Sequence, residues 1–212
     1  MEDILAVYQR PYDPQRPVVC LDETSKVLRS TPRGTIPMQP GQNARQDYEY
    51  VRHGTADLFL TIEPLGGQRQ VRVRDRRTAR DFAEVLRALV DEDFPQAGTI
   101  VLVVDNLNTH HPAALYEHFP PPEARRIADK LEWHFTPEHG SWLNIAECEL
   151  AALTRQCLSR RIPDTTTLTN EVTAWAKRRN DAHVTVDWQF TTKDARIKLK
   201  RLYPILKEQD SA

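Results

Sequence analysis

The chain has 212 residues, of which 40% are hydrophobic, and a formal net charge of −1 at pH 7. This length suits one large domain, and this composition supplies enough apolar side chains for a core. No stretch reaches the roughly 18 consecutive apolar residues of a membrane-spanning helix. The three cysteines lack CxxC spacing, which argues against a zinc ribbon or a disulfide framework and suits a reducing compartment. We therefore expect a soluble, intracellular protein.

Positive charges are unevenly distributed along this nearly neutral chain. Residues 155–201 contain 11 Lys or Arg against 5 Asp or Glu, and six further arginines fall within residues 69–80. Such clusters favour contact with a polyanion, although a solvated face with ordinary ion pairs produces the same pattern. The candidate nucleic-acid-binding residues in these clusters are Arg76, Arg77, Lys177, Arg178 and Arg179.

The first half of the chain predicts mainly strands. Residues 1–16 are polar and contain prolines, which indicates a partial helix or a linker leading into the domain. Residues 17–23 form an apolar run that ends in two acids, and residues 30–43 are a loop rich in Pro and Gly. Three further segments have strand patterns, and a Gly-Gly turn joins the last two as a hairpin: residues 48–53, 57–63 and 70–74.

The second half predicts helices alternating with strands. Residues 78–90 form an amphipathic helix capped by Thr78, and residues 141–157 carry a continuous apolar stripe at helical spacing. The remaining predicted elements are a buried strand at 100–104, short helices at 111–119 and 122–130, a strand at 131–135, a helix at 166–177 and a looser tail at 188–203.

Three hairpin-joined strands followed by alternating helices and strands describe an α/β mixed sheet covered by helices. This is also the element order of the ribonuclease-H-like fold. We therefore expect a five-stranded mixed sheet flanked by helices, within one domain over residues 17–203 that is followed by a tail at 204–212.

Three acids have notable positions. Asp22 ends the first strand, and Asp105 directly follows the buried strand, where open α/β sheets bind their ligands. The alternative for Asp105 is a simple cap of the strand or of the next helix. Glu147 lies early on the long helix and borders its apolar stripe, whereas Glu149 is expected about 200° away, on the far side.

Three converging carboxylates repel one another unless a hard divalent cation joins them. Oxygen ligands suit Mg²⁺ or Mn²⁺, and a pair of such ions supports phosphoryl transfer. The pattern therefore predicts a two-ion site held by Asp22, Asp105 and Glu147. The other interpretation is that the three acids are separate caps and surface groups.

Other polar residues accompany the acids. Glu23 would point to the opposite face of the strand from Asp22, if the strand continues. We expect Glu23, Asn106, His110 and Asn144 to surround the metal ligands without themselves binding metal. Trp142, at the start of the long helix, is suited either to stacking on a base or to filling the core.

Three motifs carry a family resemblance. LDET at 21–24, VVDN at 103–106 followed by His110, and SWLNIAE at 141–147 resemble the catalytic blocks of DDE transposases. The similarity is greatest to the bacterial insertion-sequence branch of the Tc/mariner superfamily, and it extends over residues 17–203. It implies metal-dependent DNA strand cleavage and strand transfer at element ends, by a homodimer on DNA, with Asp22, Asp105 and Glu147 as metal ligands.

The chain departs from the family pattern in two respects. Glu147 follows Asp105 by 42 positions, more than in eukaryotic mariner members, and residues 120–130 account for the excess. The N-terminal helix-turn-helix DNA-binding region of the family has no counterpart in this sequence. The resemblance therefore predicts a catalytic domain alone, in the bacterial cytoplasm, associated with the nucleoid and not with a membrane.

Two other functions remain open from the sequence. One is another ribonuclease-H-like nuclease, acting on Holliday junctions or RNA–DNA hybrids with the same metals. The other is a non-catalytic fragment of a transposase that binds DNA or inhibits a full-length partner.

Overall fold

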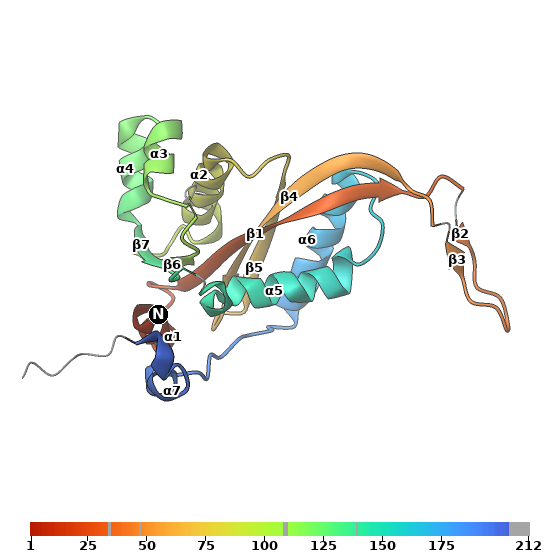
Figure 1. Ribbon diagram of the computed structural model, residues 1–212. Helices are drawn as coiled ribbons and strands as arrows, with labels where there is room; N and C mark the ends of the chain where they lie inside the picture. The colour runs from red at the N-terminus through yellow and green to blue at the C-terminus, as the bar shows by residue number, and fades with distance from the viewer. Residues whose placement is uncertain (34, 47, 108–109, 139, 204–212) are drawn as a thin grey trace, which may run out of the picture.

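The computed structural model describes residues 1–33, 35–46, 48–107, 110–138 and 140–203. Its centre is a five-stranded sheet with the strand order β5-β4-β1-β6-β7 (Figure 1). β1 pairs antiparallel with β4, and β4 antiparallel with β5, whereas β6 runs parallel to both β1 and β7. The predicted mixed sheet is confirmed. Its strands are β1 (Val18–Ser30), β4 (Val51–Glu63), β5 (Gln68–Arg74), β6 (Ile100–Val104) and β7 (Leu131–Phe135).

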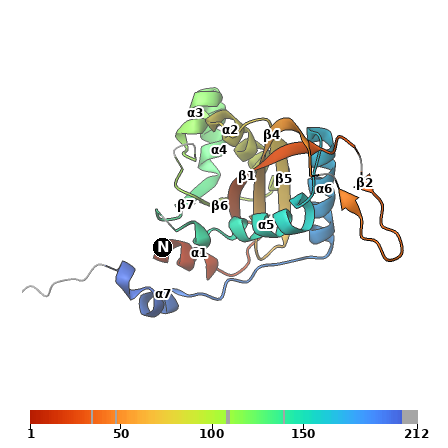
Figure 2. The same ribbon diagram turned by 45° about the vertical axis from the view of Figure 1, so that its right-hand side comes forward.

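Helices cover both faces of this sheet (Figure 2). On one face pack α1 (Glu2–Tyr8), α5 (Ile145–Leu153) and α6 (Thr165–Asp181), and on the other pack α2 (Ala79–Ala88), α3 (Ala113–His118) and α4 (Pro121–Asp129). A last helix, α7 (Thr192–Lys198), lies against α1. In the described residues, no helix is both long and apolar enough to cross a bilayer.

Alternation along β1 divides the core in two. Cys20 points to the α5 face and packs with Ile145 and Ala146, while Val19 and Leu21 point to the α2 face. All five residues of β6 are buried, as expected for a parallel strand with helices on both sides.

Of the two predictions for the N-terminal segment, the structure shows the partial helix. Residues 1–16 were expected to form a partial helix or a linker, but Ile4, Leu5 and Val7 of α1 are completely buried in the same core as α5. The Tyr8 hydroxyl donates a hydrogen bond to the carbonyl of Leu143, 2.7 Å away. This segment is therefore part of the domain, and the linker interpretation is wrong.

The strands β1 and β4 are longer than the sequence patterns indicate. Residues 48–53 and 57–63 were predicted as two strands, but Val51–Glu63 is continuous, and β1 extends to Ser30. Beyond Asp22 the two strands pair with each other, from Asp22 opposite Leu60 to Ser30 opposite Val51. Their outer ends lead into the short strands β2 (Thr35–Ile36) and β3 (Arg45–Gln46), which project from the domain (Figure 1).

The predicted helix over 141–157 is divided into three pieces. A 3₁₀ turn, η2 (Ser141–Leu143), precedes α5, and a π-helical turn, η3 (Thr154–Leu158), follows it. Asn144 causes the first break, because its extended backbone interrupts the helix and its side chain caps the next turn. The predicted cap of α2 is confirmed: Thr78 and Asp81 form a reciprocal capping box.

Glu149 is buried in an ion cluster that the sequence did not indicate. It is only 3% exposed, and its carboxylate accepts hydrogen bonds from Arg179 at 2.7 and 3.1 Å. The Nε of Arg69, which is also buried, lies 3.2 Å from the same carboxylate. Glu149 therefore joins β5, α5 and α6. The prediction that it faces away from the sheet is wrong, because Arg69 of β5 and Arg179 of α6 both contact its carboxylate.

Replacing the buried carboxylate in Glu149→Gln should lower the free energy of unfolding by about 3–5 kcal/mol, since the buried Arg69 and the half-buried Arg179 lose their counter-charge. Urea denaturation followed by circular dichroism measures the change. The matched control is Glu117→Gln on the exposed surface of α3, which should change stability by less than about 0.5 kcal/mol. Equal losses in both variants would contradict a structural role for the cluster.

Candidate active site

The parallel register of β1 and β6 brings two of the predicted acids to one edge of the sheet. Cys20 lies opposite Val103, and Asp22 and Asp105 each follow that pair by two residues in the same direction. Both acids therefore lie where β6 ends and β1 continues with β4 as its neighbour. The predicted position of Asp105, at the carboxyl end of a buried strand, agrees with this arrangement.

Asn144 connects the start of α5 to β1 beside Asp22. Its side-chain NH₂ donates to the carbonyl of Leu21 at 2.9 Å, and its side-chain oxygen accepts from the Ala146 backbone N–H at 3.2 Å. The side chain is fully buried. It therefore fixes the first turn of α5, which carries Glu147, next to the strand that carries Asp22.

The charges of the three acids act on one another. Burial raises the pKa of Asp22 to about 7, against the hydrogen bond from the Glu23 backbone N–H, and the charges of Asp105, Glu23 and Glu147 raise it further. The negative charges of the other two predicted metal ligands thus act on Asp22 and disfavour its ionised form. Glu147 itself is exposed, whereas we expected it to border the buried stripe.

The His110 ring lies between the carboxylates of Asp105 and Glu23. It is 1% exposed, its Nδ1 hydrogen-bonds to Asp105, and its Nε2 lies 3.0 Å from Glu23. Burial lowers the pKa of His110, but the hydrogen bonds to Asp105 and Glu23 outweigh burial and raise it to about 9. The ring is therefore an imidazolium at neutral pH, and it also stacks on Phe82, with centroids 4.5 Å apart.

The positions of the other predicted neighbours follow from the same strands. Glu23 points to the α2 face, opposite to Asp22, because β1 continues past it. Glu23 and Asp22 thus lie on different faces of the sheet, and Glu23 contacts His110. Asn106 is exposed immediately after Asp105.

Whether this site suits divalent metal ions depends on the side-chain atoms that could act as ligands. No described group of three acidic, histidine or cysteine side chains is already arranged to hold a metal ion. Asp105 is instead hydrogen-bonded to His110, and Glu147 is exposed. The donor set itself fits Mg²⁺ or Mn²⁺, because it consists of carboxylates whose mutual repulsion a dication relieves.

The predicted nucleic-acid-binding residues differ in whether another side chain already pairs with them. Arg76, Arg77 and Arg178 are exposed, and none of them forms an ion pair with another described residue. Lys177 pairs with Asp181 at 2.6 Å, on the surface. Arg179 is committed to Glu149, so the structure gives it a role in the core instead of at the surface.

Trp142 belongs to an aromatic cluster at the start of α5. It is 42% exposed, and its ring lies 6.5 Å from Trp188 and 5.8 Å from Phe190 between centroids. Tyr8 packs on the other side of Trp188, at 5.3 Å. We did not predict the role of Tyr8, although the apolar spacing of residues 4, 5 and 8 was a signal for a packed helix.

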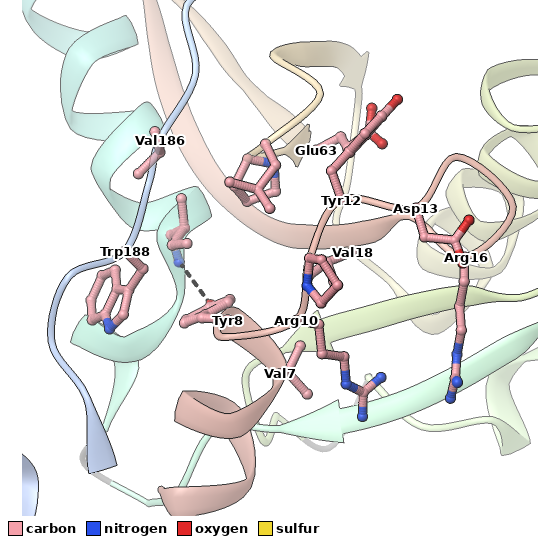
Figure 3. A pocket seen from close by; sticks show the side chains of 14 residues that line it. Val7, Tyr8, Arg10, Tyr12, Asp13, Arg16, Val18, Glu63, Val186 and Trp188 are labelled. Carbon is pink, nitrogen blue, oxygen red and sulfur yellow. Dashed lines mark hydrogen bonds between the residues drawn. The ribbon is translucent and has the colours of Figure 1, made fainter. Parts of the chain in front are cut away.

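A pocket lies beside this cluster and away from the acids (Figure 3). Its walls come from α1, the segment after α1, the β4–β5 turn and Trp188. None of Asp22, Asp105 and Glu147 lines it. The acids therefore lie outside this pocket, at the end of β6 beside β1.

Comparison with solved structures concerns the fold. The crystal structure of the Mos1 strand transfer complex is similar with a TM-score of 0.52 and 16% identity, over 86% of this chain and 55% of the Mos1 chain. This chain thus spans about half the length of that neighbour, whose likeness confirms the predicted ribonuclease-H-like fold. A chain of the simian T-cell lymphotropic virus intasome in complex with PP2A regulatory subunit B56 gamma matches at a TM-score of 0.45 and 9% identity, over 96% of this chain and 60% of that one.

The comparison with curated proteins gives no match. The family model described as "DDE superfamily endonuclease" matches residues 17–169, which include Asp22, Asp105 and Glu147. The matched segment covers most of the chain and contains all three motifs on which the predicted resemblance depended. The chain belongs to the DDE superfamily endonucleases.

Proposed function

We propose that this chain is the catalytic domain of a transposase that cleaves DNA strands at insertion-sequence ends and joins them to target DNA. The observation that carries the proposal is geometric: strand register brings Asp22 and Asp105 to one edge of the sheet, and Asn144 holds the first turn of α5, with Glu147, beside Asp22, in a DDE superfamily endonuclease. The similar Mos1 structure, a strand transfer complex, supports the choice of reaction.

Asp22, Asp105 and Glu147 would hold Mg²⁺ or Mn²⁺, and two such ions, when bound, supply an activated water or 3′-hydroxyl and stabilise the leaving oxygen. The chain itself provides the orientation of these ligands. The His110 imidazolium, braced by Glu23, fixes the direction of the Asp105 carboxylate. Asn144 keeps the first turn of α5 against β1, so that Glu147 stays within reach of Asp22.

Substrate contacts come from exposed cations and from the aromatic cluster. Arg76, Arg77, Lys177 and Arg178 are placed to contact phosphates, which supply affinity without sequence information. Trp142 is exposed enough to stack on a base. We further propose that the protein acts as a homodimer on DNA, because two element ends must be joined in one reaction.

The variant Asp105→Asn should lose DNA cleavage by at least about 100-fold, because the amide removes a charged ligand from the metal site. The assay follows nicking of a supercoiled plasmid that carries the insertion-sequence ends, with Mg²⁺ or Mn²⁺. Asp187→Asn removes the same charge from an exposed segment and should leave nicking unchanged. Equal activity of wild type and Asp105→Asn would remove the central proposal.

The variant Glu23→Gln/His110→Gln keeps neutral hydrogen-bonding groups behind Asp105 and removes the ion pair. We expect the Mn²⁺ concentration for half-maximal nicking to rise by about 10–100-fold, because groups that orient metal ligands have effects of this size. Thermal unfolding of the variant separates this effect from loss of the fold. An unchanged Mn²⁺ requirement would show that His110 does not orient Asp105.

The same assays decide between the proposed function and the two alternatives. Cleavage of RNA–DNA hybrids without cleavage of duplex DNA would indicate a hybrid-specific nuclease. Metal-independent DNA binding without any nicking would indicate a non-catalytic fragment.

A further inference from the structure

A hollow on the surface lies at the base of the projecting β1–β4 hairpin, away from the acids. We call it the basic hollow. It is lined by Lys26, Val27 and Arg29 of β1 and by Ser159, Arg160 and Arg161, which follow η3. Four of its six lining residues are cationic.

The positive charge of the basic hollow is poorly neutralised. Within the described ranges, Glu171 is the one carboxylate that pairs with these cations, through Arg160. Lys26 donates to the carbonyls of Leu158 and Arg160, and Arg161 donates to carbonyls of the hairpin. Carbonyl partners hold the side chains in place but leave their net charge, so the hollow attracts anions.

The arginines of the basic hollow are also held in position. Arg29 and Arg161 both lie over the ring of Tyr50, with their guanidinium carbons 4.4 and 5.8 Å from its centroid. The Nε of Arg29 is buried and has no hydrogen-bond partner among the described residues. A fixed cationic group with an unused donor loses little conformational entropy when it binds an anion.

Two elements lead from the acids to the basic hollow. On β1, Lys26 follows Asp22 by four residues on the same face, which corresponds to about 13 Å. Along α5 and η3, Ser159 follows Glu147 by twelve residues, or about 18 Å. The helix and the strand pack against each other, and beyond Cys20 no described strand other than β4 pairs with β1. An extended substrate can therefore reach both sites along one open edge.

We propose that the basic hollow binds the phosphate backbone of the DNA whose strand is cleaved at Asp22, Asp105 and Glu147. The distances of 13–18 Å span about four to five nucleotides at roughly 3.4 Å per nucleotide of one strand. The inference rests on the proposed function, because it takes DNA as the substrate, and it adds a contact region in which Arg160 and Arg161 of the 155–201 cluster join Lys26 and Arg29 of β1. In this arrangement the basic hollow holds the duplex in place, and the three acids act on the strand that lies next to them.

The test measures the salt dependence of DNA binding by fluorescence anisotropy, with a duplex of about 30 base pairs in EDTA and KCl from about 50 to 200 mM. In Arg29→Gln/Arg160→Gln, the slope of log K against log salt should fall by about 1.8, and affinity at about 150 mM should fall roughly 30-fold. The control, Arg125→Gln/Arg126→Gln, removes two paired arginines from α4 and should keep the wild-type slope.

A second variant separates weaker DNA binding from a loss of the fold. Arg160→Glu changes an exposed side chain and should weaken binding more than Arg125→Glu, its equally charged control on α4. An unchanged slope in both hollow variants, or an equal change in the controls, would overturn the inference. Because binding is measured without divalent metal, a lowered slope without cleavage would refute the proposed function alone, and cleavage with an unchanged slope would refute this inference alone.

Discussion

The hydrogen bond from Asn144 to the carbonyl of Leu21 is the constraint on which the site depends. Asp22 and Asp105 meet through strand pairing, but Glu147 arrives from a helix that no backbone ladder connects to the sheet. The buried Asn144 side chain connects the start of that helix to β1, and it also caps the helix. Burial of the same amide makes its loss costly, since the freed carbonyl and N–H groups would then lack partners.

The sequence predicted most of the sheet and the position of Asp105, because both depend on local patterns. The apolar run of β6 followed directly by Asp105 is such a pattern, and so is the Thr78 cap of α2. Some errors are local, such as the break of the long helix at Asn144, and others concern long-range contacts. The sequence around Glu149 does not show that Arg179 of α6 binds it, and Tyr8 of α1 bonds to Leu143, which lies 135 positions later.

His110 shows a different limit of sequence interpretation. Its place after Asp105 predicted proximity, but its second partner, Glu23, lies on another strand and on the face opposite to Asp22. Adjacent residues thus have different surroundings: Asp22 lies on the α5 face of β1, while Glu23 contacts the His110 ring on the α2 face. Two consecutive acids within one strand can therefore lie near the same site without sharing the same contacts.

The position of α4 explains why the distance in sequence between the last two acids is a poor guide to the site. α3 and α4 lie on the α2 face of the sheet, whereas α5 lies on the other face, fixed by Asn144. Residues added between Asp105 and Glu147 can extend this outer layer without moving either carboxylate. By contrast, one residue inserted between Cys20 and Asp22 would turn Asp22 to the wrong face of β1. The number of residues between Asp105 and Glu147 can thus change, whereas the number between Cys20 and Asp22 cannot.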